Sequence, residues 1–348
     1  MTGIDSVQLQ QVIVHKVGNP TRGEELKLSP HTLTLNDPIV QGLLTRYFLS
    51  PFNDLEHHHF THLSDLDLNE IYRYVTAIFR DPATLAEQSH LIARFLYSKS
   101  THVKVKEGEL YVALFDECPF DGDYLPAIGI FKSESKETFL KVFPHGQGWE
   151  VIHEEGIDIR KLDKGCLIFK TAQAEGYKVC LVDSTNKQQD TQYWVKDFLQ
   201  VIPYADSYHN THQYMDLCKD FIKNEYPEKF DVAKSDQIDL MNKSMDYFKN
   251  KEQFSETEFT EEVLFHPEIK DSFMEYKKHY ENAREYELGN DFDIHGAAVQ
   301  KQSKMFKSIL KLDKNFHVYI HGRRDLIEKG YDEMTQKKYY KLFFDEEK

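Results

Sequence analysis

The spacing of apolar residues changes twice along this chain, and these changes limit the folds that it can adopt. Before residue 100 the apolar residues recur at helical spacing, whereas residues 110 to 182 contain short β-branched or aromatic runs. From Trp194 to about Arg284 the helical spacing returns. Consecutive short strands with short connections favour an antiparallel sheet. The pattern therefore predicts an α+β protein with N-terminal helices and a mostly antiparallel sheet, a helical middle and a small C-terminal β-hairpin sheet.

The length of 348 residues favours two domains, which we expect at 1–203 and 204–348. Turn and capping signals set the expected elements of the first domain. Strands are predicted at 12–17, 25–28, 110–115, 125–131, 138–143, 165–170 and 177–182, and helices from Asp37-Pro38 to Ser50, over 68–79 and from Asp81-Pro82 onward.

The second half has its own start and stop signals. One helical stripe contains Val195, Phe198, Leu199 and Ile202, another helix is expected to stop before Pro227, and Ser255 to Glu258 reads as a capping box. Near the C-terminus, 308–312 and 316–320 are expected to form a hairpin around Asp313-Lys314-Asn315, with 339–344 as a third strand.

Charge is distributed unevenly. The chain has 43 Lys and Arg against 58 Asp and Glu, a net charge of −15, which disfavours binding of nucleic acid over the whole surface. Segment 296–324 is the exception, because it holds seven basic residues and one acid, Asp313. Composition alone leaves two interpretations open, contact with DNA phosphates or docking on the chain's own acidic surface. The candidate DNA-binding residues are Lys301, Lys304, Lys307, Lys311, Lys314, Arg323 and Arg324.

No familiar catalytic motif occurs, because GxSxG, Walker A and GxGxxG patterns are all missing. The histidines at 57–59 and 62, and the pair His209 and His212, lack partners at ordinary metal-ligand spacing. Cys118 lies beside two carboxylates, which raise the pKa of a thiol and oppose nucleophilic use. We therefore expect no catalytic residues, no metal and no cofactor. A metal-dependent nuclease, with Asp183 and Lys170 or Lys178 converging, is kept as a third hypothesis.

The remaining signals concern location. The sequence has no apolar run long enough to cross a bilayer and no basic region before an apolar one at its start. Four scattered cysteines without a CxxC spacing are typical of reduced, buried thiols. These features predict a cytoplasmic protein without membrane contact.

The C-terminal segments carry a resemblance. FKSILKLDKNF at 306–316, VYIHGR at 318–323 and KYYKLFF at 338–344, with WVKDFL at 194–199, resemble the bacterial nucleoid-associated protein family (NdpA-like). The resemblance implies a non-enzymatic cytoplasmic protein found with the chromosome, and it brings no catalytic residues. It leaves two possibilities open: DNA bound with little sequence preference through the basic segment, or an adaptor held at the nucleoid by other DNA-handling proteins.

Overall fold

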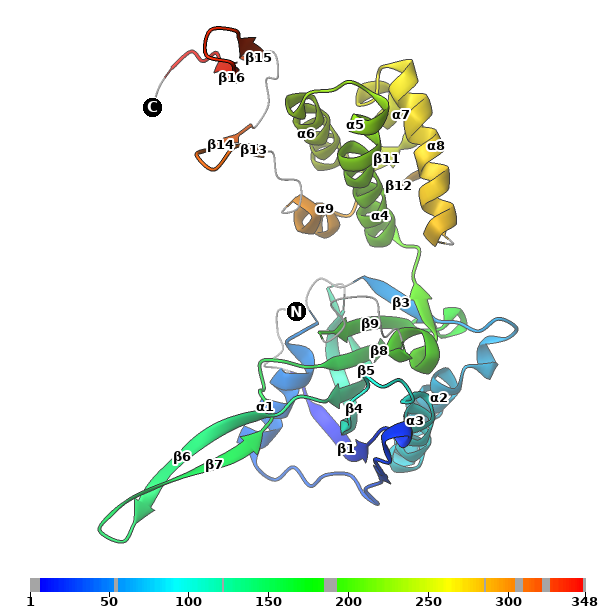
Figure 1. The fold of residues 1–348 in the computed structure, drawn as a ribbon. Helices are drawn as coiled ribbons and strands as arrows, with labels where there is room; N and C mark the ends of the chain where they lie inside the picture. Colours follow the sequence, from blue (N-terminus) through cyan, green and yellow to red (C-terminus); the bar gives the residue numbers. More distant parts are fainter. Residues whose placement is uncertain are drawn as a thin grey trace. The chain divides into compact units, whose positions relative to one another are not determined.

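A computed structural model describes residues 7–52, 56–120, 122–184, 193–284, 286–303, 309–320 and 326–346. The chain divides into two compact units, Met1–Tyr204 and Ala205–Lys348, each with its own hydrophobic core (Figure 1). Both helices and antiparallel sheets are present, so the predicted α+β fold class is confirmed.

The first unit is built on an eight-stranded sheet in which every neighbouring pair is antiparallel, as predicted. Its strand order is β10-β3-β9-β8-β5-β4-β1-β2. The strands are β1 (Leu9–Val17), β2 (Leu26–Lys27), β3 (His57–Phe60), β4 (Gly108–Phe120), β5 (Asp123–Ser133), β8 (Lys164–Phe169), β9 (Lys178–Asp183) and β10 (Val201–Pro203).

Helices cover both faces of this sheet, because its central strands are apolar on both sides. Ile128 and Ile130 of β5 belong to a core shared with helices α2 (Glu70–Arg80) and α3 (Leu85–Lys99) and with the π-helix Tyr193–Leu199. The alternate residue Phe131 faces helix α1 (Pro38–Leu49), where its ring stacks on Phe48 with centroids 4.4 Å apart. Side chains that alternate along β5 thus pack against α2 and α3 on one face of the sheet and against α1 on the other.

Asn69 ties the start of α2 to the sheet edge. Its side-chain oxygen accepts the backbone N–H of Tyr72 at 3.0 Å, as an N-cap does. Its amide nitrogen donates to the carbonyls of Thr61 and Leu199 at 3.0 Å each. One fully buried side chain therefore joins the helix to segments from two other parts of the sequence.

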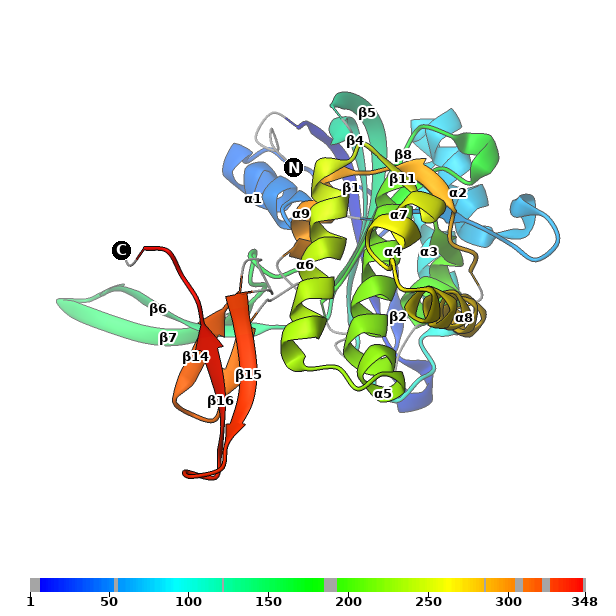
Figure 2. The same cartoon turned by 90° about the horizontal axis from the view of Figure 1, so that it is seen from above.

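The predicted strand at 138–143 exists but is not part of the main sheet. It is β6 (Glu137–His145), which pairs with β7 (Gly148–Gly156), a strand that the sequence argument missed. Gly146 has φ +59° in the connecting turn, a conformation that suits glycine. The two strands extend from the first unit as a ribbon (Figure 2).

The second unit packs helices around an aromatic core that includes Tyr214, Phe221 and Phe273. Its elements are α4 (Ser207–Asp220), the π-helix Phe221–Glu225, α5 (Tyr226–Lys229), α6 (Lys234–Asn250), β11 (Gln253–Ser255), α7 (Glu256–Glu262), α8 (Pro267–Arg284), β12 (Asp291–Asp293) and α9 (Gly296–Ser303).

Three local predictions in this part of the chain were wrong. Pro227 does not end the helical segment, because it lies in the first turn of α5, where its missing N–H costs nothing. Ser255 precedes α7 but makes no side-chain capping bond, so the capping box does not form. Ile202 belongs to strand β10 and not to the preceding helical stripe.

The C-terminal region consists of two hairpins. The predicted hairpin is confirmed as β13 (Ile309–Leu312) and β14 (Phe316–Tyr319), with Asp313 at φ 52°. The expected third strand is β16 (Lys337–Leu342), which pairs with β15 (Ile327–Asp332) and makes a separate two-stranded sheet. Strand β15 was not predicted, because Lys329, Gly330 and Asp332 interrupt its apolar pattern.

Candidate nucleic-acid interface

Three of the seven predicted DNA contacts lie within the described residues. Lys301 is on α9, Lys311 is in the middle of β13, and Lys314 lies in the turn after it. All three are exposed. Lys304, Lys307, Arg323 and Arg324 lie outside the described residues.

Lys301 is oriented by an aromatic residue of α4. Its Nζ atom lies 3.3 Å from the Tyr208 hydroxyl and 5.9 Å from the centre of the same ring. Ala298 and Gln302 of α9 are fully buried, so the buried side of this helix is fixed. The ammonium group is thus held at one place on the surface of the second unit.

The β13–β14 hairpin is attached to α6 by one of its two faces. Leu310 is 2% exposed and packs in a small core with Ile238 of α6, Ile320 and Ile327. Asn242 of α6 donates a hydrogen bond to the Ile320 carbonyl at 3.2 Å. These contacts determine which side chains of the hairpin face outward.

The outward face combines positive charge with aromatic surface. Lys311 and His317 are directly paired across the two strands, and Tyr319 lies on the same face because side chains alternate along a strand. Tyr319 is 63% exposed. Charge that contacts phosphate and a ring that stacks on a base are the two means by which proteins hold nucleic acid without reading sequence. The sequence prediction included Lys311 but not His317 or Tyr319, although strand alternation from Lys311 places both on the same face.

The second C-terminal hairpin pairs two of its lysines with acidic residues across its strands. Lys341 lies 3.6 Å from the carboxylate of Glu328, its direct cross-strand partner. Lys337 is paired in register with Asp332. Residues 327–342 hold four lysines against three acidic residues, a net charge of +1, which equals the net charge of residues 309–319.

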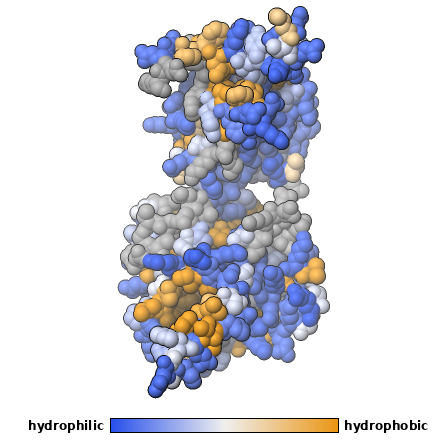
Figure 3. Space-filling view, turned by 60° about the vertical axis from the view of Figure 1, so that its left-hand side comes forward, coloured by the Kyte–Doolittle hydropathy of each residue, from blue (hydrophilic) through white to orange (hydrophobic). Residues whose placement is uncertain are grey.

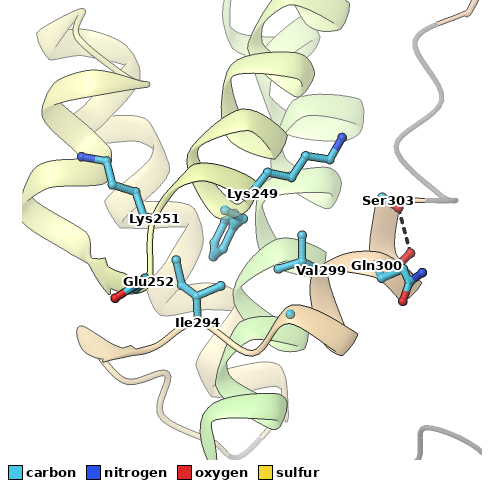
Figure 4. A pocket seen from close by; sticks show the side chains of 9 residues that line it. Lys249, Lys251, Glu252, Ile294, Val299, Gln300 and Ser303 are labelled. Carbon is cyan, nitrogen blue, oxygen red and sulfur yellow. Dashed lines mark hydrogen bonds between the residues drawn. The ribbon is translucent and has the colours of Figure 1, made fainter.

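A shallow pocket adjoins α9 in the same unit (Figure 4). It has a volume of about 450 Å³ and apolar walls from Phe248, Ile294 and Val299. Lys251 at its edge is already engaged by Glu258 at 2.6 Å and Glu262 at 3.2 Å. The pocket therefore lacks a converging set of polar groups for a small ligand.

The histidines at 57–59 form strand β3, so adjacent rings alternate between the two faces of the sheet. The His57 ring stacks on Phe120 with centroids 5.0 Å apart, and the His59 ring packs edge-on against Tyr204 at 5.4 Å. His209 is buried with its ring 4.6 Å from that of Tyr286. In the part of the chain that the structure describes, no three His, Cys, Asp or Glu side chains are grouped to hold a metal ion.

The groups considered for catalysis are engaged elsewhere. Burial raises the pKa of the Cys118 thiol to about 12, so the direction predicted from sequence is right, but the cause is desolvation and not the adjacent carboxylates. Asp183 pairs with Lys164 at 2.8 Å. Lys170, one of the lysines considered for a nuclease site, donates instead to the Phe79 carbonyl at 3.0 Å. The other, Lys178, lies against the ring of Tyr204.

No described helix is both long and apolar enough to span a membrane. The family model described as "Nucleoid-associated protein YejK" matches residues 13–339, which is most of the chain. No curated protein matches this chain. The predicted resemblance to nucleoid-associated proteins is therefore confirmed. The chain belongs to the nucleoid-associated protein YejK family, which is associated with the bacterial nucleoid in the cytoplasm.

Proposed function

We propose that this nucleoid-associated protein contacts DNA directly through a cationic surface of its second unit. The observation that carries the proposal is the outward face of the β13–β14 hairpin. One face of the hairpin is anchored to α6 through Leu310, and the other offers Lys311 and Tyr319 to solvent. We assign two further described lysines, Lys301 and Lys314, to the same surface. The sequence prediction adds Lys304, Lys307, Arg323 and Arg324.

The mode of contact follows from the residue types. Lysine is a flexible point charge, which suits phosphate oxygens and carries little information about bases. A two-stranded ribbon has the width of a major-groove ligand, but this face has no Asn, Gln or Arg with which to read base edges among its described residues. We therefore propose binding with little sequence preference and no chemical reaction on the DNA.

An adaptor that reaches the chromosome through another protein is the second candidate function. The net charge of −15 favours it, because an acidic chain repels a polyphosphate at long range. The exposed Phe343 and Phe344 after β16 also suit a protein partner better than a phosphate backbone. The two functions differ in their affinity for bare DNA.

A charge-reversal experiment on the full chain tests the proposal. Lys311→Glu/Lys314→Glu changes two exposed residues of the proposed surface, and Lys27→Glu/Lys161→Glu makes the same change of net charge in the first unit. Affinity for a duplex of arbitrary sequence is measured by fluorescence anisotropy at low salt. We expect the first variant to lose at least tenfold in affinity and the control to lose little.

Equal loss in the two variants would show that only net charge matters, and it would contradict the proposed surface. A wild-type chain that does not bind bare DNA at low salt would favour the adaptor. Circular dichroism of each variant checks that the fold is retained.

A further inference from the structure

The β6–β7 ribbon has one face that is apolar and uncovered. Val142 and Val151 are direct cross-strand partners, and Leu140 and Trp149 lie on the same face by strand alternation. Their exposed fractions are 73% for Leu140, 58% for Val142, 74% for Trp149 and 56% for Val151. Figure 3, which brings this side of the first unit forward, shows apolar surface there.

The opposite face of the ribbon mixes charged and apolar side chains, because Phe139, Phe143 and Ile152 alternate there with Lys141, Glu150 and Glu154. Lys141 and Glu154 form an ion pair at 3.0 Å, and the Nδ1 atom of His145 lies 3.4 Å from the Glu150 carboxylate. The ring of Phe139 lies across Gly156, where an added Cβ would come within 2.9 Å of it. The two faces thus differ in charge, because the ion pairs lie on this face and the most exposed apolar side chains lie on the other. The ribbon pairs with no third strand in the described part of the chain.

Such an exposed face needs a partner. A lone two-stranded ribbon is marginally stable in water, and an apolar patch of this size marks an interaction site. DNA does not fit, because residues 137–156 contain four glutamates and one lysine. The occupant must therefore be apolar and free of phosphate.

We propose that the occupant is the same face of a second copy of this chain, so that two β6–β7 ribbons stack face to face in a dimer. The four apolar side chains present on the order of 500 Å² per copy. Two such faces together remove on the order of 1,000 Å² from water, which is the lower limit for a specific interface. The expected dimer is therefore weak.

Charge repulsion between two copies is kept small at this face. A twofold axis sets each apolar side chain against the partner's apolar face and leaves Glu150 and Glu154 on the outside. The one glutamate on the apolar face, Glu155, is at the end of the ribbon nearest the body. Nine-residue strands reach roughly 30 Å. Two acidic bodies joined by their ribbons can therefore stay apart by more than a Debye length of about 8 Å.

Sedimentation equilibrium of the full chain tests the proposal. We expect a reversible dimer whose Kd rises at least tenfold in the variant Val142→Thr/Trp149→Thr/Val151→Thr. Threonine keeps the preference for strand conformation, so the ribbon is retained. Ile152→Thr, on the opposite face of the same ribbon, is the matched control and should leave Kd unchanged. A wild-type chain that is monomeric at every concentration, or a dimer unaffected by the triple variant, would overturn the proposal.

A distance measurement confirms the geometry independently. The four native cysteines are buried, so Val142→Cys gives a single exposed position for a spin label. Stacked sheets lie about 10 Å apart, and labels at position 142 should therefore report a short distance between copies. Labels at Lys27→Cys, on the body of the first unit, should report a much longer one. A long or absent distance at position 142 in a dimeric sample would contradict the face-to-face arrangement.

Discussion

His15 donates a hydrogen bond from its Nε2 atom to the hydroxyl of Ser89, 3.0 Å away, inside the core of the first unit. The tautomer is set by the other ring nitrogen, because Nδ1 accepts the backbone N–H of Ser29 at 3.1 Å. The Ser89 hydroxyl in turn donates to the Ala86 carbonyl at 2.7 Å. The neutral ring of His15 therefore links β1 to α3, and a second proton on Nδ1 would break the bond to Ser29.

This arrangement predicts that the first unit loses stability in acid. Burial, helped by the neighbouring His90, lowers the pKa of His15 from 6.5 to about 4. Between these values the unfolded chain binds a proton that the folded chain does not. The contribution of His15 to the free energy of unfolding is therefore complete above pH 6.5, and it is lost as the pH drops toward 4. The lowered pKa of His15 corresponds to about 3 kcal/mol in the free energy of unfolding, at 1.36 kcal/mol per pH unit.

Urea unfolding of wild type and His15→Gln at pH 7 and pH 4.5 measures this loss. The free energy of unfolding should fall less between pH 7 and pH 4.5 in the variant than in wild type, by about 2 kcal/mol. His145→Gln changes a histidine whose side chain is 73% exposed and should behave as wild type. Identical pH dependence in His15→Gln and wild type would show that the ring is not held neutral.

The β6–β7 ribbon shows where sequence patterns lose their power to predict the fold. Ile128 and Phe131 alternate between two buried faces, and their strand was predicted because apolar runs in a sheet covered on both sides are unambiguous. Phe139 and Val142 are just as apolar, so their strand was predicted too, but nothing local distinguishes a strand inside the sheet from one outside it. Strand partners depend on tertiary contacts, which spacing alone does not encode.

The candidate interface was predictable in part for a similar reason. Lys311 stands out in the sequence because basic residues cluster around it, and Asp313-Lys314-Asn315 marks a turn. Which side of the hairpin meets solvent depends on Leu310 packing against Ile238 of α6, 72 positions earlier in the chain. That the face with Lys311 and Tyr319 is the solvent-facing one could be known only from that contact.

A buried lysine in the second unit predicts a large effect of a single substitution. Lys277 is 5% exposed, forms an ion pair with Glu256 and donates to the Asn290 side chain at 2.8 Å. Tyr214 donates to the same Glu256 carboxylate at 3.0 Å. Lys277→Met leaves that carboxylate without its cation, which costs about 3–5 kcal/mol.

Urea unfolding monitored by tyrosine fluorescence measures the loss of stability in Lys277→Met, with Lys278→Met as the control. Lys278 is the next residue on α8 and is exposed, so its replacement should change stability by no more than about 0.5 kcal/mol. Equal effects of the two substitutions would mean that the buried pair contributes nothing to the second unit.

The cysteines should be unreactive while the protein is folded. All four are buried, and burial raises the pKa of Cys166 and Cys218 as it does that of Cys118. Ellman's reagent at pH 8 should react with none of them in the native protein and with all four after unfolding. A reductant with a chelator should leave the melting temperature unchanged. A fall of many degrees would reveal a structural disulfide or metal.

The salt dependence of DNA binding tests the phosphate-contact hypothesis most directly. If about five lysines each neutralise one phosphate, log Kd against log salt has a slope of magnitude about 4 to 5, from roughly 0.9 per phosphate. Because lysines carry little base information, affinities for random and A·T-rich duplexes should agree within roughly tenfold, or about 1.4 kcal/mol. Competition between unrelated duplexes at two salt concentrations measures both quantities. A thousandfold preference for one duplex would mean that bases are read, and a flat salt response would mean that phosphates are not the contact.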